Sequence, residues 1–74
     1  MKDIDLSLSD LIGASFRDCN LSNSDFSQTN CRDADFSGAD LTSVNFQGAD
    51  LTNANFTGTI VVESNLVKAK ISGI

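Results

Sequence analysis

The chain contains no histidine, tryptophan, tyrosine or proline, and these absences argue against several classes of function. Without histidine, the commonest metal ligand and the commonest general base of enzymes are both missing. Only five lysines and arginines oppose ten aspartates and glutamates in 74 residues, which gives a formal charge of −5. Because nucleic-acid binding depends on clustered cations, this balance argues against direct nucleic-acid binding. The composition favours a non-enzymatic protein without a metal site or a cofactor.

Long hydrophobic runs are absent as well. The longest aliphatic run is Ile60-Val61-Val62, far short of the roughly 20 residues that span a membrane. The first five residues, Met1-Lys2-Asp3-Ile4-Asp5, lack the apolar core of a signal peptide. We therefore expect no membrane insertion and a cytoplasmic location. Apolar residues still make up 41% of the chain, too many for a disordered acidic tail.

Apolar residues recur at every fifth position along the whole chain. These positions, here called centres, hold only apolar residues or cysteine. They are Leu6, Leu11, Phe16, Leu21, Phe26, Cys31, Phe36, Leu41, Phe46, Leu51, Phe56, Val61, Leu66 and Ile71. The residue before the centre is Asp or Asn in eleven of the fourteen repeats, and every glycine stands two residues after a centre.

A period of five fits neither a helix nor a strand. On an α-helix, a step of five residues turns the chain by about 140° net, so the apolar side chains would scatter around the helix. A chain that bends every five residues, with two inward and three outward positions per repeat, satisfies the pattern instead. Glycine, asparagine and aspartate two residues after the centre are suited to such bends, since they tolerate left-handed backbone angles.

The repeats Ala39-Asp40-Leu41-Thr42-Ser43 and Ala49-Asp50-Leu51-Thr52-Asn53 resemble those of the pentapeptide-repeat family. The resemblance covers residues 4–73, within a single domain of residues 1–74. It implies an all-β fold, a right-handed quadrilateral (four-sided) β-helix solenoid with about three and a half coils of twenty residues each.

Coils of twenty residues would stack residues twenty apart in vertical columns. The inward columns would then be Leu6/Phe26/Phe46/Leu66, Leu11/Cys31/Leu51/Ile71, Phe16/Phe36/Phe56 and Leu21/Leu41/Val61. All five phenylalanines would lie on two opposite faces, with smaller side chains between them, which fills a square cross-section. The two cysteines, Cys19 and Cys31, would lie inward on opposite faces, so we expect free buried thiols rather than a disulfide.

The repeat pattern breaks at both ends. Aliphatic residues replace outward polar ones at Ile60, Val62 and Val67, beside Lys68 and Lys70, and at Leu8 and Ile12 near the start. Two interpretations remain open. The terminal repeats could have drifted, or folded their side chains over as a cap. Alternatively, these residues could form a docking patch, with Leu8 and Ile12 as a second one.

The sequence predicts a non-enzymatic structural or protein-interaction module. We expect it to dock end-on, or by a flat face, onto a larger protein assembly or a second copy of itself. The partner would be another protein or, in a homodimer, the same chain bound through a terminal coil. The last repeat is not followed by a capping helix, which favours covering of that end by another subunit. The family resemblance also implies an alternative, a DNA-mimicking regulator of a nucleic-acid-binding protein such as DNA gyrase.

Overall fold

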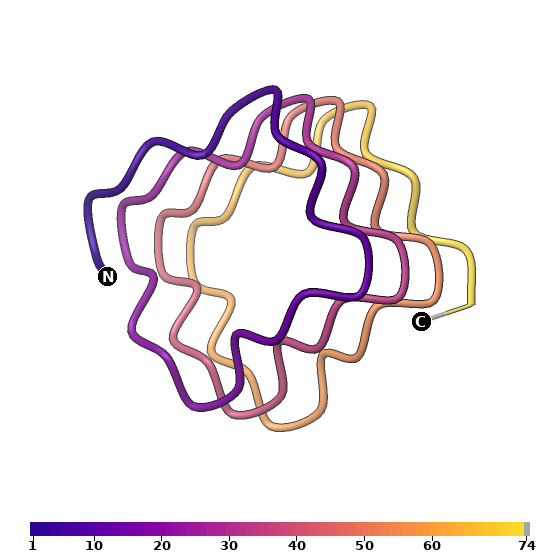
Figure 1. Cartoon of the computed structure of the whole chain (residues 1–74). Coiled ribbons are helices and arrows are strands. Elements are labelled where there is room, and N and C mark those ends of the chain that lie inside the picture. The colour runs from indigo at the N-terminus through magenta and orange to yellow at the C-terminus, as the bar shows by residue number, and fades with distance from the viewer. Residues whose placement is uncertain (74) are drawn as a thin grey trace.

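The computed structural model describes residues 1–73. Over this range the backbone winds into a four-sided tube of stacked coils (Figure 1). Parallel bridges join residues twenty apart, from Asp5 with Asp25 at one end to Asp50 with Lys70 at the other. The predicted stacking of residues twenty apart is therefore confirmed. Residues 1–73 include no helix, and each side of a coil contributes an isolated bridge rather than an extended strand.

The chain turns by a β-turn after each centre. At the centres from Leu6 to Phe56 and at Leu66, the centre carbonyl accepts a hydrogen bond from the N–H three residues later, as between Phe36 and Ala39 at 2.9 Å. The third residue of each turn has a positive φ, from 55° at Gln28 to 80° at Gly73, at ten non-glycine residues and five glycines. The prediction of left-handed corners is confirmed. Leu8, a residue type that rarely adopts this conformation, also occupies such a corner.

The aspartate or asparagine before each centre has a structural role. Its side-chain oxygen accepts a hydrogen bond from the N–H two residues later, as Asp40 does from Thr42 at 3.0 Å. All eleven aspartates and asparagines at this position make this contact. Such local contacts stabilise the bend, which explains why these two residue types recur.

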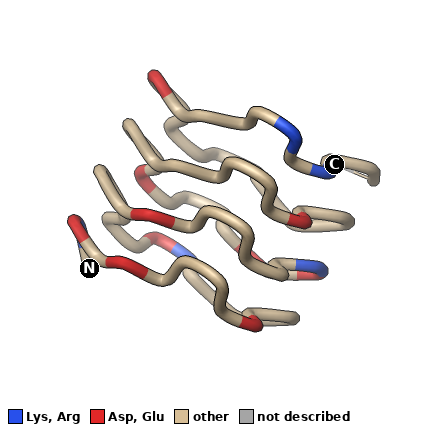
Figure 2. The backbone as a smooth tube through the Cα atoms, turned by 90° about the horizontal axis from the view of Figure 1, so that it is seen from above, with Lys and Arg blue, Asp and Glu red and all other residues tan. Residues whose placement is uncertain are grey.

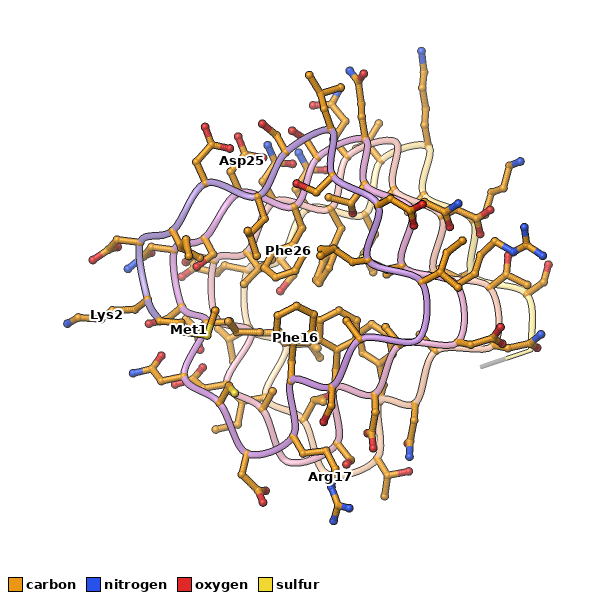
Figure 3. All side chains as sticks on the ribbon, viewed as in Figure 1. Met1, Lys2, Phe16, Arg17, Asp25 and Phe26 are labelled. Atoms are coloured by element: carbon orange, nitrogen blue, oxygen red, sulfur yellow. The ribbon has the colours of Figure 1, made fainter. Side chains whose placement is uncertain are left out.

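Phenylalanine rings fill the interior of the tube, as the column prediction requires. Phe16 and Phe26 point into the tube, whereas Arg17 and Asp25 point away from it (Figure 3). Phe36 lies at the centre of the cluster. Its ring centroid is 5.2 Å from those of Phe16 and Phe56 in its own column, and 5.8 and 5.7 Å from those of Phe26 and Phe46 in the opposite column. The buried side chains all come from residues 16–54, so the core belongs to the middle of the stack.

Both cysteines are free thiols. Cys31 is buried as predicted, with its Sγ 3.2 Å from the Thr29 Oγ1, and burial raises the pKa of its thiol. Cys19 is only half-buried, since it lies nearer the end of the stack, where less covers it. Within residues 1–73, no helix has the length and apolar character needed to traverse a bilayer.

Candidate docking site

The centres of the last coil point inward but are poorly covered. Val61, Leu66 and Ile71 are 50%, 45% and 56% exposed, although one coil earlier the same columns hold fully buried leucine and phenylalanine. The difference arises because, in the part of the chain that the structure describes, no coil stacks on residues 54–73. We call Phe56, Val61, Leu66 and Ile71 together the C-terminal end face.

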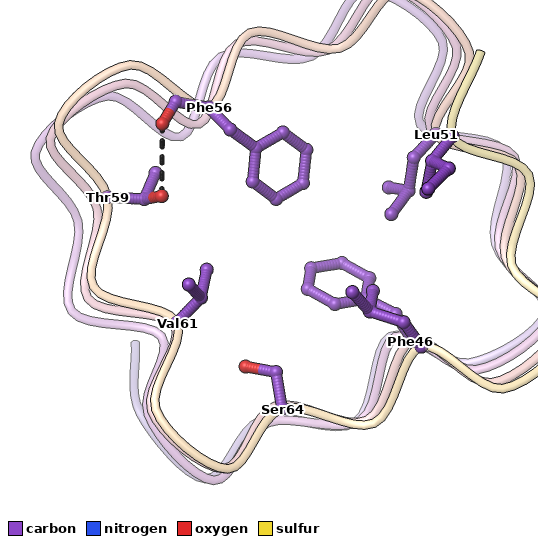
Figure 4. Close-up of a pocket in the computed structure, with 8 residues that line it drawn as sticks. Phe46, Leu51, Phe56, Thr59, Val61 and Ser64 are labelled. Carbon is purple, nitrogen blue, oxygen red and sulfur yellow. Dashed lines mark hydrogen bonds between the residues drawn. The ribbon is translucent and has the colours of Figure 1, made fainter. Parts of the chain in front are cut away.

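A depression of about 340 Å³ opens at this face (Figure 4). Its lining is mostly apolar: Phe46, Leu51, Phe56, Thr59, Val61, Ser64, Leu66 and Ile71. The two hydroxyl groups are already engaged, since Thr59 donates to the Phe56 carbonyl at 3.0 Å and Ser64 to the Leu41 carbonyl at 2.6 Å. The depression therefore suits an apolar side chain better than a charged group.

The residues that the sequence indicated as a docking patch surround this face without lining the depression. We call Ile60, Val62, Val67, Lys68 and Lys70 the outer C-terminal patch. All five are exposed, and none belongs to the lining. Their aliphatic members would have to shield the inward centres to act as a cap. The half-exposed centres indicate that they do not.

The N-terminal end is better covered than the C-terminal one. Phe16 is buried there, and Leu6 and Leu11 are half-buried. The first residues pass close to the next coil, where the Ser24 hydroxyl donates to the Met1 carbonyl at 3.3 Å. The second predicted patch, Leu8 and Ile12, is exposed at this end, and so lies at the opposite end of the stack from the outer C-terminal patch.

The carboxylates stabilise turns rather than forming a site. Hydrogen bonds from Ser or Thr two residues later lower the pKa values of Asp5, Asp35, Asp40 and Asp50. Arg17 lies 3.8 Å from Asp35 in an exposed ion pair. Among residues 1–73, no three carboxylates or thiols come together as metal ligands would.

The family model described as pentapeptide repeats (8 copies) matches residues 1–28, 19–58 and 34–73. These matches together span nearly the whole chain. The chain belongs to the pentapeptide repeat family. Pentapeptide repeat proteins are generally non-enzymatic structural repeat proteins, and membership implies a right-handed quadrilateral β-helix.

Two solved pentapeptide repeat proteins are similar to this one. The first, from the thylakoid lumen of Arabidopsis thaliana, is 35% identical with a TM-score of 0.53, over 80% of this chain and 45% of its own. The present pentapeptide repeat protein thus spans less than half of that relative's length. The second, Rfr23 from the cyanobacterium Cyanothece 51142, is 19% identical with a TM-score of 0.35, over 99% of this chain and 80% of its own. The curated proteins include no significant match.

Sequence reasoning indicated the residues of the outer C-terminal patch and expected end-on docking, but it did not name the C-terminal end face of this pentapeptide repeat protein. The centres Val61, Leu66 and Ile71 are apolar like the other centres and were assigned to the core. Their exposure depends on what stacks on them, which the residue type at a centre does not reveal.

Proposed function

We propose that this pentapeptide repeat protein is a structural interaction module that docks another protein through its C-terminal coil. The observation that carries the proposal is the half-exposure of Val61, Leu66 and Ile71, three inward-pointing apolar side chains. An exposed apolar surface of this kind, rimmed by polar residues, marks protein interaction sites.

The outer C-terminal patch supports the same assignment. Ile60, Val62 and Val67 extend the apolar surface from the end face onto the sides of the last coil. Lys68 and Lys70 stand beside them, both exposed. An apolar centre with a charged rim is the usual anatomy of a protein–protein interface, and the two lysines favour a partner with acidic groups at its edge.

The flat sides of the tube are poorer candidates. No outward position between residues 15 and 58 holds an aliphatic residue. The aspartates and asparagines on these sides accept hydrogen bonds from the backbone two residues later. Groups engaged in local turns have less capacity left for a partner, which favours docking at the end.

Affinity capture from the native source with a charge-bearing variant tests this function. The variant Ile60→Asp, Val62→Asp, Val67→Asp places three carboxylates on the outer C-terminal patch. A matched control, Asn23→Asp, Gln28→Asp, Gln47→Asp, adds the same charge at exposed positions of the middle coils. Circular dichroism and thermal unfolding must first show that both variants keep the fold.

We expect the intact chain and the control to retain a common partner, and the patch variant to retain at least about tenfold less of it. Equal retention by all three would refute docking at the C-terminal coil. The DNA-mimicking alternative has its own measurement, inhibition of DNA supercoiling by purified gyrase. A lack of inhibition at high protein concentration would end that alternative.

A further inference from the structure

We infer that the partner seated on the C-terminal end face is a second copy of this chain, stacked head to tail. The first coil of one copy (residues 1–20) would lie on the last coil of the other (residues 54–73) and continue the β-helix. This inference rests on the proposed function, because it uses the same end face, and it adds the identity and orientation of the partner.

The backbone at the two ends is complementary. Hydrogen bonds between neighbouring coils run in two directions. The Leu6 N–H donates forward, to the Asp25 carbonyl of the following coil, at 2.8 Å, and the Asp25 N–H donates backward, to the Ile4 carbonyl of the preceding coil, at 2.9 Å. In the last coil, Leu66 holds the place of a forward donor, and in the first coil, Asp5 holds the place of a backward donor. Neither N–H group donates a hydrogen bond within residues 1–73. The parallel ladder can continue only where the last coil of one copy, with its forward donors, meets the first coil of another copy, with its backward donors. Two copies in this arrangement are stacked head to tail.

The charges of the two end coils are opposite in sign. Residues 1–20 carry two cations and four carboxylates, a formal −2, at Lys2, Asp3, Asp5, Asp10, Arg17 and Asp18. Residues 54–73 carry two cations and one carboxylate, a formal +1, at Glu63, Lys68 and Lys70. In Figure 2, blue segments, which mark Lys and Arg, lie on the coil at the C-terminal end. Opposite charges attract a first coil to a last coil, whereas two like ends repel each other.

The apolar side chains fit in one placement along the five-residue repeat. In this placement, each residue of the second copy lies over the residue of the first copy whose number is 55 higher, so that Leu6 lies over Val61. The five-residue repeat then continues across the contact, and the second copy is rotated by a quarter turn relative to the first. Each residue of the C-terminal end face is then covered by an apolar residue: Phe56 by Met1, and Val61, Leu66 and Ile71 by the centres Leu6, Leu11 and Phe16.

The same placement also explains two outward residues that broke the motif. Ile12 of the second copy falls over Val67 of the first, so one residue of each predicted patch meets the other, while Leu8 falls over Glu63. No carboxylate faces another carboxylate, because Asp5 falls over Ile60 and Asp10 over Asn65. Like charges directly opposite would have been destabilising.

The size of the contact sets its strength. The Cα atoms span 22 × 20 × 19 Å, so an end of the stack measures about 20 Å by 20 Å and buries roughly 800 Å² over both partners. That area lies below the standard size of stable complexes. We therefore expect weak association, with a Kd of about 10 µM to 1 mM, and weaker still as salt rises.

Two variants, each blocked at one end, test the arrangement by sedimentation velocity and light scattering. The N-blocked chain carries Leu8→Asp and Ile12→Asp, and the C-blocked chain carries Val62→Asp and Val67→Asp. All four positions are exposed, so the fold should persist, and circular dichroism checks this. A control with Gln28→Asp and Gln47→Asp adds the same charge away from both ends.

The intact chain and the control should form chains of copies that lengthen with concentration, because a head-to-tail contact does not close. Each blocked variant alone should associate at least about tenfold more weakly, while an equal mixture of the two should form a one-to-one dimer through the remaining free ends. The inference is overturned if the intact chain stays monomeric at about 1 mM, or if the N-blocked chain alone dimerises as tightly as the intact chain. The two proposals can fail separately. If the intact chain is monomeric but the patch variant loses a protein that the intact chain captures, this inference is refuted and the proposed function is supported.

Discussion

Leu41 and Val61 occupy the same inward column one coil apart, yet Leu41 is fully buried and Val61 is half exposed. The two coils are joined here by a hydrogen bond of 2.7 Å from the Leu41 N–H to the Ile60 carbonyl. Both residues are apolar centres that point inward. At an inward position, burial therefore depends also on whether a coil stacks on each side of the residue.

Replacement of these two residues by alanine should therefore have unequal effects. Leu41→Ala leaves a cavity in a closed core and should lower the free energy of unfolding by about 2–5 kcal/mol. Val61→Ala removes a smaller side chain that is already half in water, and should cost less than about 1 kcal/mol. Urea unfolding of both variants measures the difference. Similar losses would show that the last coil is covered in solution.

The corner at Leu8 predicts a stabilising substitution. Leu8 has a φ of 64° and its side chain is 75% exposed, so it bears left-handed strain with little packing in return. Leu8→Asn should raise the free energy of unfolding by roughly 0.5–1 kcal/mol, since asparagine adopts this conformation more readily. Ile12→Asn is the matched control, because Ile12 is also exposed but its φ is not positive. If both variants gain equally, removal of surface hydrophobicity rather than relief of backbone strain is the cause.

Two glycine corners should respond differently to alanine. Gly13 and Gly38 have nearly equal φ angles of 70° and 71°. A Cβ at Gly38 would overlap an Asp18 side-chain oxygen, whereas a Cβ at Gly13 would meet nothing within 4 Å. Gly13→Ala should cost about 1–2 kcal/mol from backbone strain, and Gly38→Ala should cost more because Asp18 must also move. Chemical denaturation of both variants checks the order. The reverse order would contradict the close approach of Asp18.

The aspartates of the turns predict loss of stability in acid. Hydrogen bonds from Thr42 and Thr52 lower the pKa values of Asp40 and Asp50 in the folded chain below the ordinary value of 3.8. The unfolded chain therefore takes up protons first as pH falls. The stabilising effect of the two ionised aspartates is complete above their pKa in the unfolded chain, and it disappears as pH falls through their pKa in the folded chain.

Urea midpoints between pH 7 and pH 2 should thus be constant near neutrality and fall below about pH 4. The variant Thr42→Val, Thr52→Val should show a smaller fall, because its aspartates titrate nearer their ordinary range. NMR titration of the two carboxyl carbons gives the pKa values directly. Unchanged values in the double variant would count against the hydroxyl groups as the cause.

The sequence was sufficient to predict how this chain stacks. Phe16, Phe36 and Phe56 were assigned to one column because the family resemblance implied coils of twenty residues, and the ring centroids of neighbouring members do lie 5.2 Å apart. This succeeded because a solenoid repeats one local rule, so every residue twenty positions away reports on the same contact. The left-handed corners could be predicted from glycine, asparagine and aspartate for the same reason.

The candidate site was only half predictable. Ile60, Val62 and Val67 stood out because they replace polar residues at outward positions. Val61, Leu66 and Ile71 did not stand out, since an apolar residue is the ordinary occupant of a centre and their exposure comes from the lack of a coil stacked on them within residues 1–73. The exposure of Leu8 likewise followed from its outward position, but a leucine at a φ of 64° could not have been anticipated from the residue type.

The bridges between residues twenty apart also fix how such a chain can change in length. Duplicating residues 31–50 would insert one full circuit and leave every column aligned above and below it. Removing five residues instead would rotate all that follows by one side of the square, so that Phe16, for example, would lie under Leu41 rather than under Phe36. A change in length of twenty codons therefore keeps every stacking pair, whereas a change of five codons gives every residue beyond it a new neighbour in its column.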